Sequence, residues 1–195
     1  MSAPLILASI SPRRRALLAE HGVEFEVIPS NVPETPLTGE SPGQFARRAA
    51  QEKVAEVARR YPGRFILGAD TVVVLDGAIF GKPMDRDDAR RMLRSLSGRR
   101  HAVLTAVALL HPTGHVEEVL VETEVEFRTL ADEEIEEYIE RGEPFDKAGA
   151  YAIQGSAGKF VRAVRGSYSN VIGLPIEEVT TLLQVHVPVP ARASE

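Results

Sequence analysis

The chain has 195 residues, carries a formal net charge of −5 and contains no cysteine. This length can bury a core without disulfide bonds, and the lack of cysteine excludes iron–sulfur and cysteine-based zinc sites. The negative charge argues against a general nucleic-acid binder, and no apolar run is long enough to span a bilayer. We therefore expect a cytoplasmic protein that binds neither nucleic acid polymers nor membranes, with one domain over residues 1–185 and a loose tail over 186–195.

Residues 5–21 predict a short buried strand followed by a helix. The strand is the apolar run 5–8, while Ser11 and Pro12 are typical of a helix N-cap and a first helical residue. The helix then continues toward Gly22, a residue type that commonly ends one. The first turn of this helix therefore follows closely on the carboxyl end of a strand.

This first turn carries an unusual block of positive charge. Arg13, Arg14 and Arg15 lie at the positive end of the helix dipole, where each charge costs about 0.3–1 kcal/mol. Arg14 falls on the apolar face of the helix, so we expect its guanidinium to point inward. A phosphate would offset both the repulsion from the helix dipole and the cost of pointing the charge of Arg14 inward, because free N–H groups and forked guanidinium donors bind it well. A solvated arginine cluster is the alternative interpretation.

The next segments predict a strand over 24–29, a proline-rich loop over 30–41 and a helix over 42–61. Glu34 lies in the loop, on irregular backbone of the kind that often carries ligand-binding residues. An ordinary exposed acid is the alternative for this residue. Lys53 borders the apolar face of the helix, so its ammonium can extend into a neighbouring cleft.

Residues 65–75 are apolar on both faces except for Asp70, a pattern typical of a central strand. An ionised carboxylate buried there without a partner would cost several kcal/mol. We therefore expect Asp70 to meet a metal, a lysine or a substrate, with a purely structural ion pair as the alternative. Thr71 should lie on the opposite face unless the strand bulges. Asp76-Gly77 predicts a tight turn that returns Lys82 toward Asp70.

The second half of the chain predicts a helix, a hairpin of two long strands and a second helix, over residues 86–96, 101–127 and 131–141. The alternation in the hairpin is regular and suggests no chemistry in either strand. The remaining elements are a strand, a turn and a last helix, predicted over residues 160–164, 166–170 and 175–183.

Residues 146–159 differ from their surroundings, because three glycines lie around Gln154 and indicate a close approach of the backbone to a ligand. The amide of Gln154 offers both a donor and an acceptor, as reading the edge of a nucleobase requires. A satisfied loop amide is the alternative. The segment also carries Lys147, one of only a few lysines in an arginine-rich chain.

Together these segments resemble the Maf family of nucleoside triphosphate pyrophosphatases. The similarity extends from about Leu5 to Leu183 and includes Glu34 and Lys53. Its separated motifs, kept in order, are residues 8–14, 68–73, 81–83, 147–155 and 173–175. The resemblance implies an α/β fold in which a mixed central β-sheet is flanked by helices and two lobes surround a substrate cleft. It also implies a homodimer.

The activity implied by the resemblance is a metal-dependent attack of water on the α-phosphorus of a nucleoside triphosphate, giving monophosphate and pyrophosphate. Asp70 is cast as the proton acceptor and, with Glu34, as a ligand of Mg²⁺ or Mn²⁺. Arg13, Thr71 and Gln154 look like the residues of the family branch that acts on dTTP and UTP. CTP or modified pyrimidine nucleotides are further candidate substrates. The expected substrate-binding residues are Ser9, Arg13, Arg14, Lys53, Thr71, Lys82, Lys147 and Gln154, of which Arg13, Thr71 and Gln154 mark the branch.

Two other functions stay open at the level of sequence. One is a nucleotide-binding regulator, for example of cell division or septum formation, that does not turn its ligand over. The other is transfer of the nucleotidyl group to an acceptor other than water. Release of pyrophosphate from dTTP in the presence of a divalent cation separates an enzyme from a regulator.

Overall fold

A computed structural model describes residues 4–184, so the predicted tail over 186–195 lies outside the described residues. The strands are β1 (Leu5–Leu7), β2 (Phe25–Val27), β3 (Ile66–Leu75), β4 (Ala78–Phe80), β5 (Arg100–Leu110), β6 (Val116–Phe127) and β7 (Val161–Arg165). The helices are α1 (Pro12–Glu20), α2 (Pro42–Arg60), α3 (Arg86–Leu96), α4 (Asp132–Glu140), α5 (Tyr168–Ile172) and α6 (Ile176–Gln184), with short 3-10 helices η1 (Ala148–Ala150) and η2 (Ser156–Phe160).

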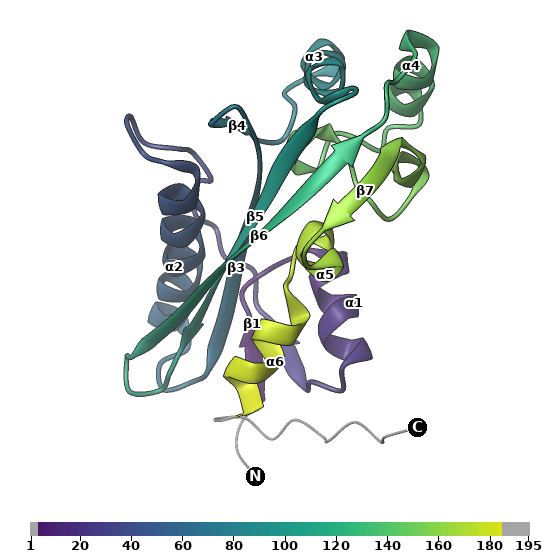
Figure 1. The fold of residues 1–195 in the computed structure, drawn as a ribbon. Helices are drawn as coiled ribbons and strands as arrows, with labels where there is room; N and C mark the ends of the chain where they lie inside the picture. The colour runs from purple at the N-terminus through teal and green to yellow at the C-terminus, as the bar shows by residue number, and fades with distance from the viewer. Residues whose placement is uncertain (1–3, 185–195) are drawn as a thin grey trace, which may run out of the picture.

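The described strands form one mixed sheet of seven strands in the order β2-β1-β3-β5-β6-β7, with β4 paired to β3 (Figure 1). β1 runs parallel to β2 and β3, whereas the other pairs are antiparallel. The predicted start of the chain is confirmed, since Ser11 caps α1 with its side chain and Pro12 is the first helical residue. The predicted mixed α/β fold is confirmed as well.

Three hydrophobic clusters hold the helices on the sheet. α2 covers one face through a cluster that includes Phe45, Val57 and Ile66. The opposite face carries two clusters, one under α1 and α6, and the other under α3, α4 and η2 (Figure 1). These two clusters are separate cores on one face of the sheet, as expected for the two lobes that the family resemblance implies.

β1 and β4 lie along the same edge of β3 without meeting. β1 pairs with Ile66 and Leu67, and β4 pairs with residues 73–75, while β5 occupies the other edge over nearly its whole length. Among the strands that the structure describes, none lies beside this edge of β3 over residues 68–72. Asp70 and Thr71 lie in this gap, on opposite faces because the strand continues without a bulge.

Two expectations for the second half of the chain are wrong. Residues 166–170 are not a turn, because α5 begins there with Ser167 as N-cap, whose Oγ accepts from the backbone N–H of Asn170 at 3.2 Å. Five helical residues are too few to show a helical period in the sequence. The long strand β5 does not alternate either, since residues 103–109 are buried on both faces. It is a central strand, with α2 on one side and the lobes on the other.

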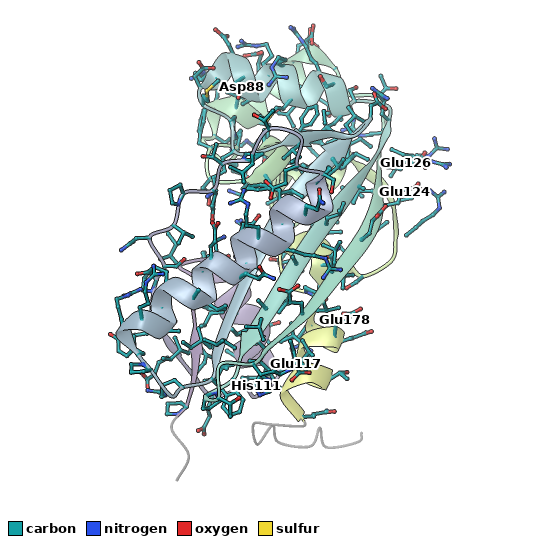
Figure 2. All side chains as sticks on the ribbon, turned by 90° about the vertical axis from the view of Figure 1, so that its left-hand side faces the viewer. Asp88, His111, Glu117, Glu124, Glu126 and Glu178 are labelled. Atoms are coloured by element: carbon teal, nitrogen blue, oxygen red, sulfur yellow. The ribbon has the colours of Figure 1, made fainter. Side chains whose placement is uncertain are left out.

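Charged side chains outside the cleft lie largely on the surface. Glu124 and Glu126 project from the outer part of β6 in Figure 2, where they pair with Arg165 at 2.5 Å and Arg100 at 3.2 Å. These pairs are solvated and contribute little stability. Within residues 4–184 no helix combines the length and apolar character needed to cross a bilayer.

Candidate active site

A cleft of about 710 Å³ opens where the edge of β3 is unpaired. Its walls come from the β1–α1 connection, the loop before α2, α2 itself, β3, the segment after β4, and residues 145–154 and 171–173. All of the side chains predicted to bind substrate or metal line it, namely Ser9, Arg13, Arg14, Glu34, Lys53, Asp70, Thr71, Lys82, Lys147 and Gln154. The fold therefore brings together residues that are far apart in the sequence.

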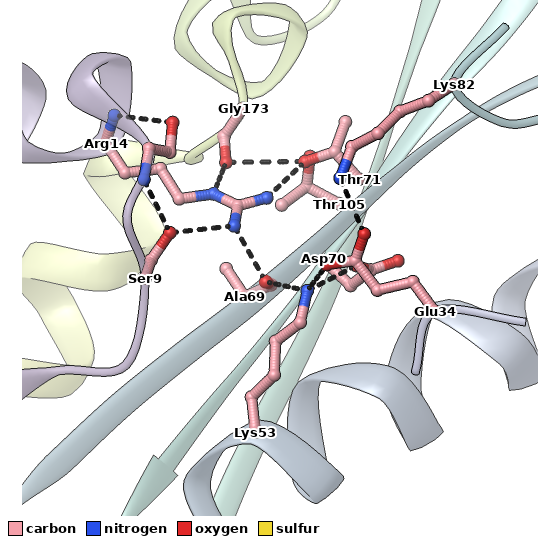
Figure 3. A network of polar contacts seen from close by, with 11 residues as sticks. Ser9, Arg14, Glu34, Lys53, Ala69, Asp70, Thr71, Lys82, Thr105 and Gly173 are labelled. Carbon is pink, nitrogen blue, oxygen red and sulfur yellow. Dashed lines mark hydrogen bonds and ion pairs between the residues drawn. The ribbon is translucent and has the colours of Figure 1, made fainter. Parts of the chain in front are cut away.

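Lys53 is the centre of the polar contacts on the α2 side of the cleft (Figure 3). Its side chain is only 6% exposed, and its Nζ lies 2.6 Å from Oδ1 of Asp70 and 2.6 Å from Oε1 of Glu34. Nζ also donates to the backbone oxygen of Ala69 at 3.3 Å. The expectation that buried Asp70 meets a partner is confirmed, and that partner is a lysine.

α2 can lie this close to β3 because residue 68 is glycine. A Cβ on Gly68 would lie 2.7 Å from Cγ1 of Val54 and 2.9 Å from the backbone oxygen of Ala50. Distances this short do not occur for a real Cβ, so any larger residue would push the helix away from the strand. Gly68 therefore sets the approach that lets Lys53 reach Asp70.

Glu34 joins the loop before α2 to the segment after β4. Its Oε2 accepts a hydrogen bond from Nζ of Lys82 at 2.8 Å, while Oε1 contacts Lys53. The tight turn between β3 and β4 returns Lys82 to this part of the cleft, as predicted, although Lys82 contacts Glu34 and not Asp70. Both oxygens of one carboxylate are thus held by the two lysines expected to bind phosphate.

Arg14 points inward from α1, as predicted, and its donors are largely used by the protein (Figure 3). Nε donates to the backbone oxygen of Gly173 at 2.8 Å, and Nη1 donates to the backbone oxygen of Ala69 at 2.9 Å. Nη1 also contacts Oγ of Ser9 at 3.4 Å, and Nη2 donates to Oγ1 of Thr71 at 3.1 Å. A guanidinium has five N–H donors, so one N–H of Nη2 is left for a ligand.

Further charged residues face the opposite wall of the cleft. Nη1 of Arg13 lies 3.9 Å from Oδ2 of Asp146, which is also an ion-pair partner of Lys147. The ammonium of Lys147 additionally donates to the backbone oxygen of Glu143 at 2.6 Å. Gln154 lies at the cleft with an exposed side chain. Arg13 and Asp146 therefore connect the two lobes across the cleft.

The family model described as Maf-like protein matches residues 4–186 of this chain. The chain belongs to the Maf family. Curated Maf-family relatives named dTTP/UTP pyrophosphatase include one from Anaeromyxobacter dehalogenans (strain 2CP-1), which is 54% identical over 94% of each chain. Another, from Myxococcus xanthus (strain DK1622), is 49% identical over 97% of this chain and 96% of its own. Among solved structures, the Ham1 protein of Staphylococcus aureus has a TM-score of 0.52 at 13% identity, covering 93% of this chain and 98% of that one, and shows the shared fold.

The two carboxylates of this Maf-family site differ in their affinity for a proton. Burial raises the pKa of Asp70 above its ordinary value of 3.8, although Lys53 and Arg14 oppose the shift. Partial burial would also raise the pKa of Glu34, but Lys53 and Lys82 outweigh it and lower that pKa to about 2. Neighbouring groups with separated pKa values are typical of acid–base sites.

Sequence reasoning missed the residues behind the Maf-family cleft. Oγ1 of Thr105 lies 2.9 Å from Oγ1 of Thr71. Asn170 is fully buried, and its Nδ2 donates to the backbone oxygen of Val103 at 2.9 Å and to Oγ1 of Thr123 at 3.0 Å. The available signal was the hydroxyl of Thr105, the single polar side chain in the apolar run 102–110 of β5.

A second missed pair supports the wall formed by residues 151–154. Tyr151 lines the cleft, and its hydroxyl lies 2.8 Å from Nε2 of His101, which is 4% exposed. Burial lowers the pKa of His101 to about 4, so the ring is neutral at pH 7. This neutral histidine holds the tyrosine in place without adding charge near the cleft.

Proposed function

We propose that this protein is a nucleoside triphosphate pyrophosphatase that hydrolyses dTTP and UTP to the monophosphate and pyrophosphate. The observation that carries the proposal is the cleft in which Lys53 joins Asp70 to Glu34, beside the arginines of α1. Curated relatives about half identical to this chain are named for the same activity. A regulator without turnover has no comparable support.

Cationic side chains from separate elements would bind the triphosphate. An ammonium has three N–H donors, and Glu34 uses one of those on Lys82, whereas Lys53 donates to Glu34, to Asp70 and to the backbone oxygen of Ala69. Phosphate oxygens can therefore join Glu34 on Lys82 and would replace it on Lys53. The first turn of α1 adds the side chain and the backbone N–H of Arg13, since Pro12 has no N–H and the N–H groups of Arg14 and Arg15 donate to Ser11. Both groups of Arg13 favour an anion at this end of the cleft.

Asp70 is the residue best placed to take the proton of the attacking water. Its Oδ1 is held by Lys53, whereas Oδ2 receives no hydrogen bond from the residues that the structure describes. Because burial raises its pKa, Asp70 binds a proton more readily than an ordinary carboxylate. The lysine fixes one oxygen and leaves the other available for proton transfer.

The carboxylates fit a divalent cation of the hard type. Glu34 and Asp70 both contact the ammonium of Lys53, so their oxygens lie close together, and Mg²⁺ or Mn²⁺ is commonly held by one or two carboxylates together with substrate phosphates. Residues 4–184 offer no group of three or more acidic, histidine or cysteine side chains that would hold a metal alone. When bound, the cation would stabilise the charge that develops on the phosphate oxygens. We therefore expect metal binding here to depend on the nucleotide.

Incubation with dTTP and Mg²⁺ or Mn²⁺, followed by ion chromatography of the products, tests the proposal. We expect pyrophosphate and dTMP in equal amounts. Binding of dTTP without turnover would support the regulator instead, and release of orthophosphate would contradict the reaction proposed. Parallel incubation with an alcohol acceptor reports on nucleotidyl transfer, which would give a phosphodiester product.

We also infer from the resemblance that the protein acts as a homodimer in the cytoplasm. The dimer is tested by sedimentation equilibrium at micromolar concentration, where a single species of one-chain mass would contradict it. Cell fractionation followed by detection of the chain tests the location. Neither result affects the reaction proposed above.

A further inference from the structure

A chain of hydrogen-bonding groups leads from the cleft into the sheet (Figure 3). Nη2 of Arg14 lies 3.1 Å from Oγ1 of Thr71, which lies 2.9 Å from Oγ1 of Thr105. Oγ1 of Thr105 in turn donates to the backbone oxygen of Asn170 at 3.2 Å. Thr71 lines the cleft, whereas Thr105 is fully buried and does not.

One arrangement of the protons makes every contact of this chain a hydrogen bond at the same time. A guanidinium only donates and a carbonyl oxygen only accepts, while each hydroxyl has a single proton to give. Thr105 gives its proton to Asn170, so Thr71 gives its own proton to Thr105. The other acceptor near Thr71 is the backbone oxygen of Gly173 at 3.4 Å, which also belongs to the protein. Thr71 therefore has no proton left for a ligand in the cleft.

We propose that Thr105 is a positioning residue for base selection, because it holds the Thr71 hydroxyl as an acceptor toward the nucleotide. This inference rests on the proposed function. One lone pair of Thr71 remains after the bond from Arg14, so the facing group of the substrate must donate. Phosphate oxygens at neutral pH cannot donate. The group that Thr71 faces is therefore on the nucleoside part of the substrate.

Thymine and uracil, the bases in the names of the curated relatives, share an N3–H donor. Cytosine has an unprotonated N3 at the same position, which would meet the Thr71 oxygen with two lone pairs facing each other. A site that offers only an acceptor thus favours thymine and uracil. It rejects cytosine, since two facing acceptors leave both groups without a hydrogen-bond partner.

Replacement of Thr105 by valine removes the acceptor of the Thr71 proton at nearly constant volume. The backbone oxygen of Asn170 keeps a partner in this variant, because it also accepts from the backbone N–H of Gly173 at 3.0 Å. The remaining protein acceptor for Thr71 is the oxygen of Gly173, which already binds Nε of Arg14 at 2.8 Å. Without its acceptor at 2.9 Å, the Thr71 hydroxyl can donate either to this oxygen, 3.4 Å away, or to a ligand in the cleft.

The test compares kcat/KM for UTP and CTP in the wild type, Thr105→Val and Thr105→Ser, with pyrophosphate release as the readout. We expect Thr105→Val to lower the UTP to CTP ratio about tenfold, the effect of one hydrogen bond. Thr105→Ser keeps a hydroxyl and should keep the wild-type ratio. An unchanged ratio in Thr105→Val, including an equal loss for both nucleotides, overturns the inference, as do equal wild-type efficiencies for UTP and CTP.

A measurement on the wild type covers the case in which Thr105→Val does not fold. The analogue 3-methyluridine triphosphate replaces the N3–H donor by a methyl group, and we expect its kcat/KM to fall at least as low as that of CTP. Hydrolysis of this analogue as fast as UTP overturns the inference but leaves the proposed function intact. A wild-type protein that releases no pyrophosphate from UTP refutes both.

Discussion

Nζ of Lys53 lies 2.6 Å from Oδ1 of Asp70, and both side chains are less than a tenth exposed. The same ammonium contacts Glu34, so one buried cation joins two carboxylates at the gap between β1 and β4. A buried ion pair adds little net stability, yet removing one partner is costly. The position of this pair at the cleft indicates a role in chemistry beyond that of holding the fold.

Asp70→Asn should abolish most turnover while leaving the fold intact. The amide keeps the shape and one hydrogen-bond acceptor for Lys53 but cannot take a proton from water, so we expect kcat to fall about 10²–10⁴-fold. Steady-state rates with dTTP provide the measurement, and far-ultraviolet circular dichroism serves as the control for folding. A variant with a nearly normal rate would remove Asp70 from the role of proton acceptor.

Lys53→Met should destabilise the protein, because it leaves the buried carboxylate of Asp70 without its cation. Loss of one partner of such a pair costs about 3–5 kcal/mol in the free energy of unfolding, measured by urea denaturation at pH 7. The loss should shrink at lower pH, where Asp70 can be protonated. Lys159→Met is the matched control, since Lys159 is exposed. Equal effects of the two substitutions would contradict the account.

Glu34 should contribute stability that depends on pH. Its pKa is about 2 in the folded protein against an ordinary value of 4.5, so its contribution is present above pH 4.5 and is lost as the pH falls toward 2. The raised pKa of Asp70 acts in the opposite sense, because its contribution is lost as the pH rises through that pKa. Thermal unfolding from pH 2 to 6 should show a smaller loss at low pH in Glu34→Gln than in the wild type. If the melting temperatures of the two proteins fall in parallel as the pH is lowered, the lowered pKa of Glu34 is contradicted.

Gly68→Ala should impair catalysis without touching a polar group. The added Cβ would clash with Val54 and with the backbone of Ala50, so α2 has to move away from β3 and take Lys53 with it. A shift of about 1 Å at a site of this kind costs roughly 100-fold in rate. Gly81→Ala is the control for the melting temperature, because a Cβ at that position meets nothing within 4 Å. Full activity in Gly68→Ala would show that the close approach is not needed.

Gln154→Ala should reduce discrimination among bases more than it slows hydrolysis. The amide is exposed at the cleft, where it can offer a donor and an acceptor to the edge of a base. A panel of dTTP, UTP, CTP and GTP measured at equal concentrations gives the selectivity. The assignment fails if the order and spacing of the rates stay as they are in the wild type.

Local patterns in the sequence were sufficient for much of this architecture. Ser11 and Pro12 mark the start of α1, and a single acid in an apolar run identified Asp70 as a buried residue in need of a partner. The grouping of the candidate residues in one cleft required the family resemblance in addition, because spacing alone says little about which distant segments meet.

Features that depend on distant contacts were not predictable in this way. Arg14 bonds to Gly173, 159 positions later in the chain, and no local pattern shows that most of its donors are used by the protein. Thr105 is a threonine in a strand, where that residue type is common, so its contact with Thr71 leaves no trace in periodicity. α5 was missed because its short length hides the helical period.

Hydrolysis of dTTP in water enriched in ¹⁸O tests the central claim most directly. Mass spectrometry of the products shows which phosphorus was attacked. Attack at the α-phosphorus, beside Asp70 and Lys53, places the label in dTMP and leaves the pyrophosphate unlabelled, as we predict. Label in the pyrophosphate, or in orthophosphate accompanied by dTDP, would contradict the reaction assigned to this cleft.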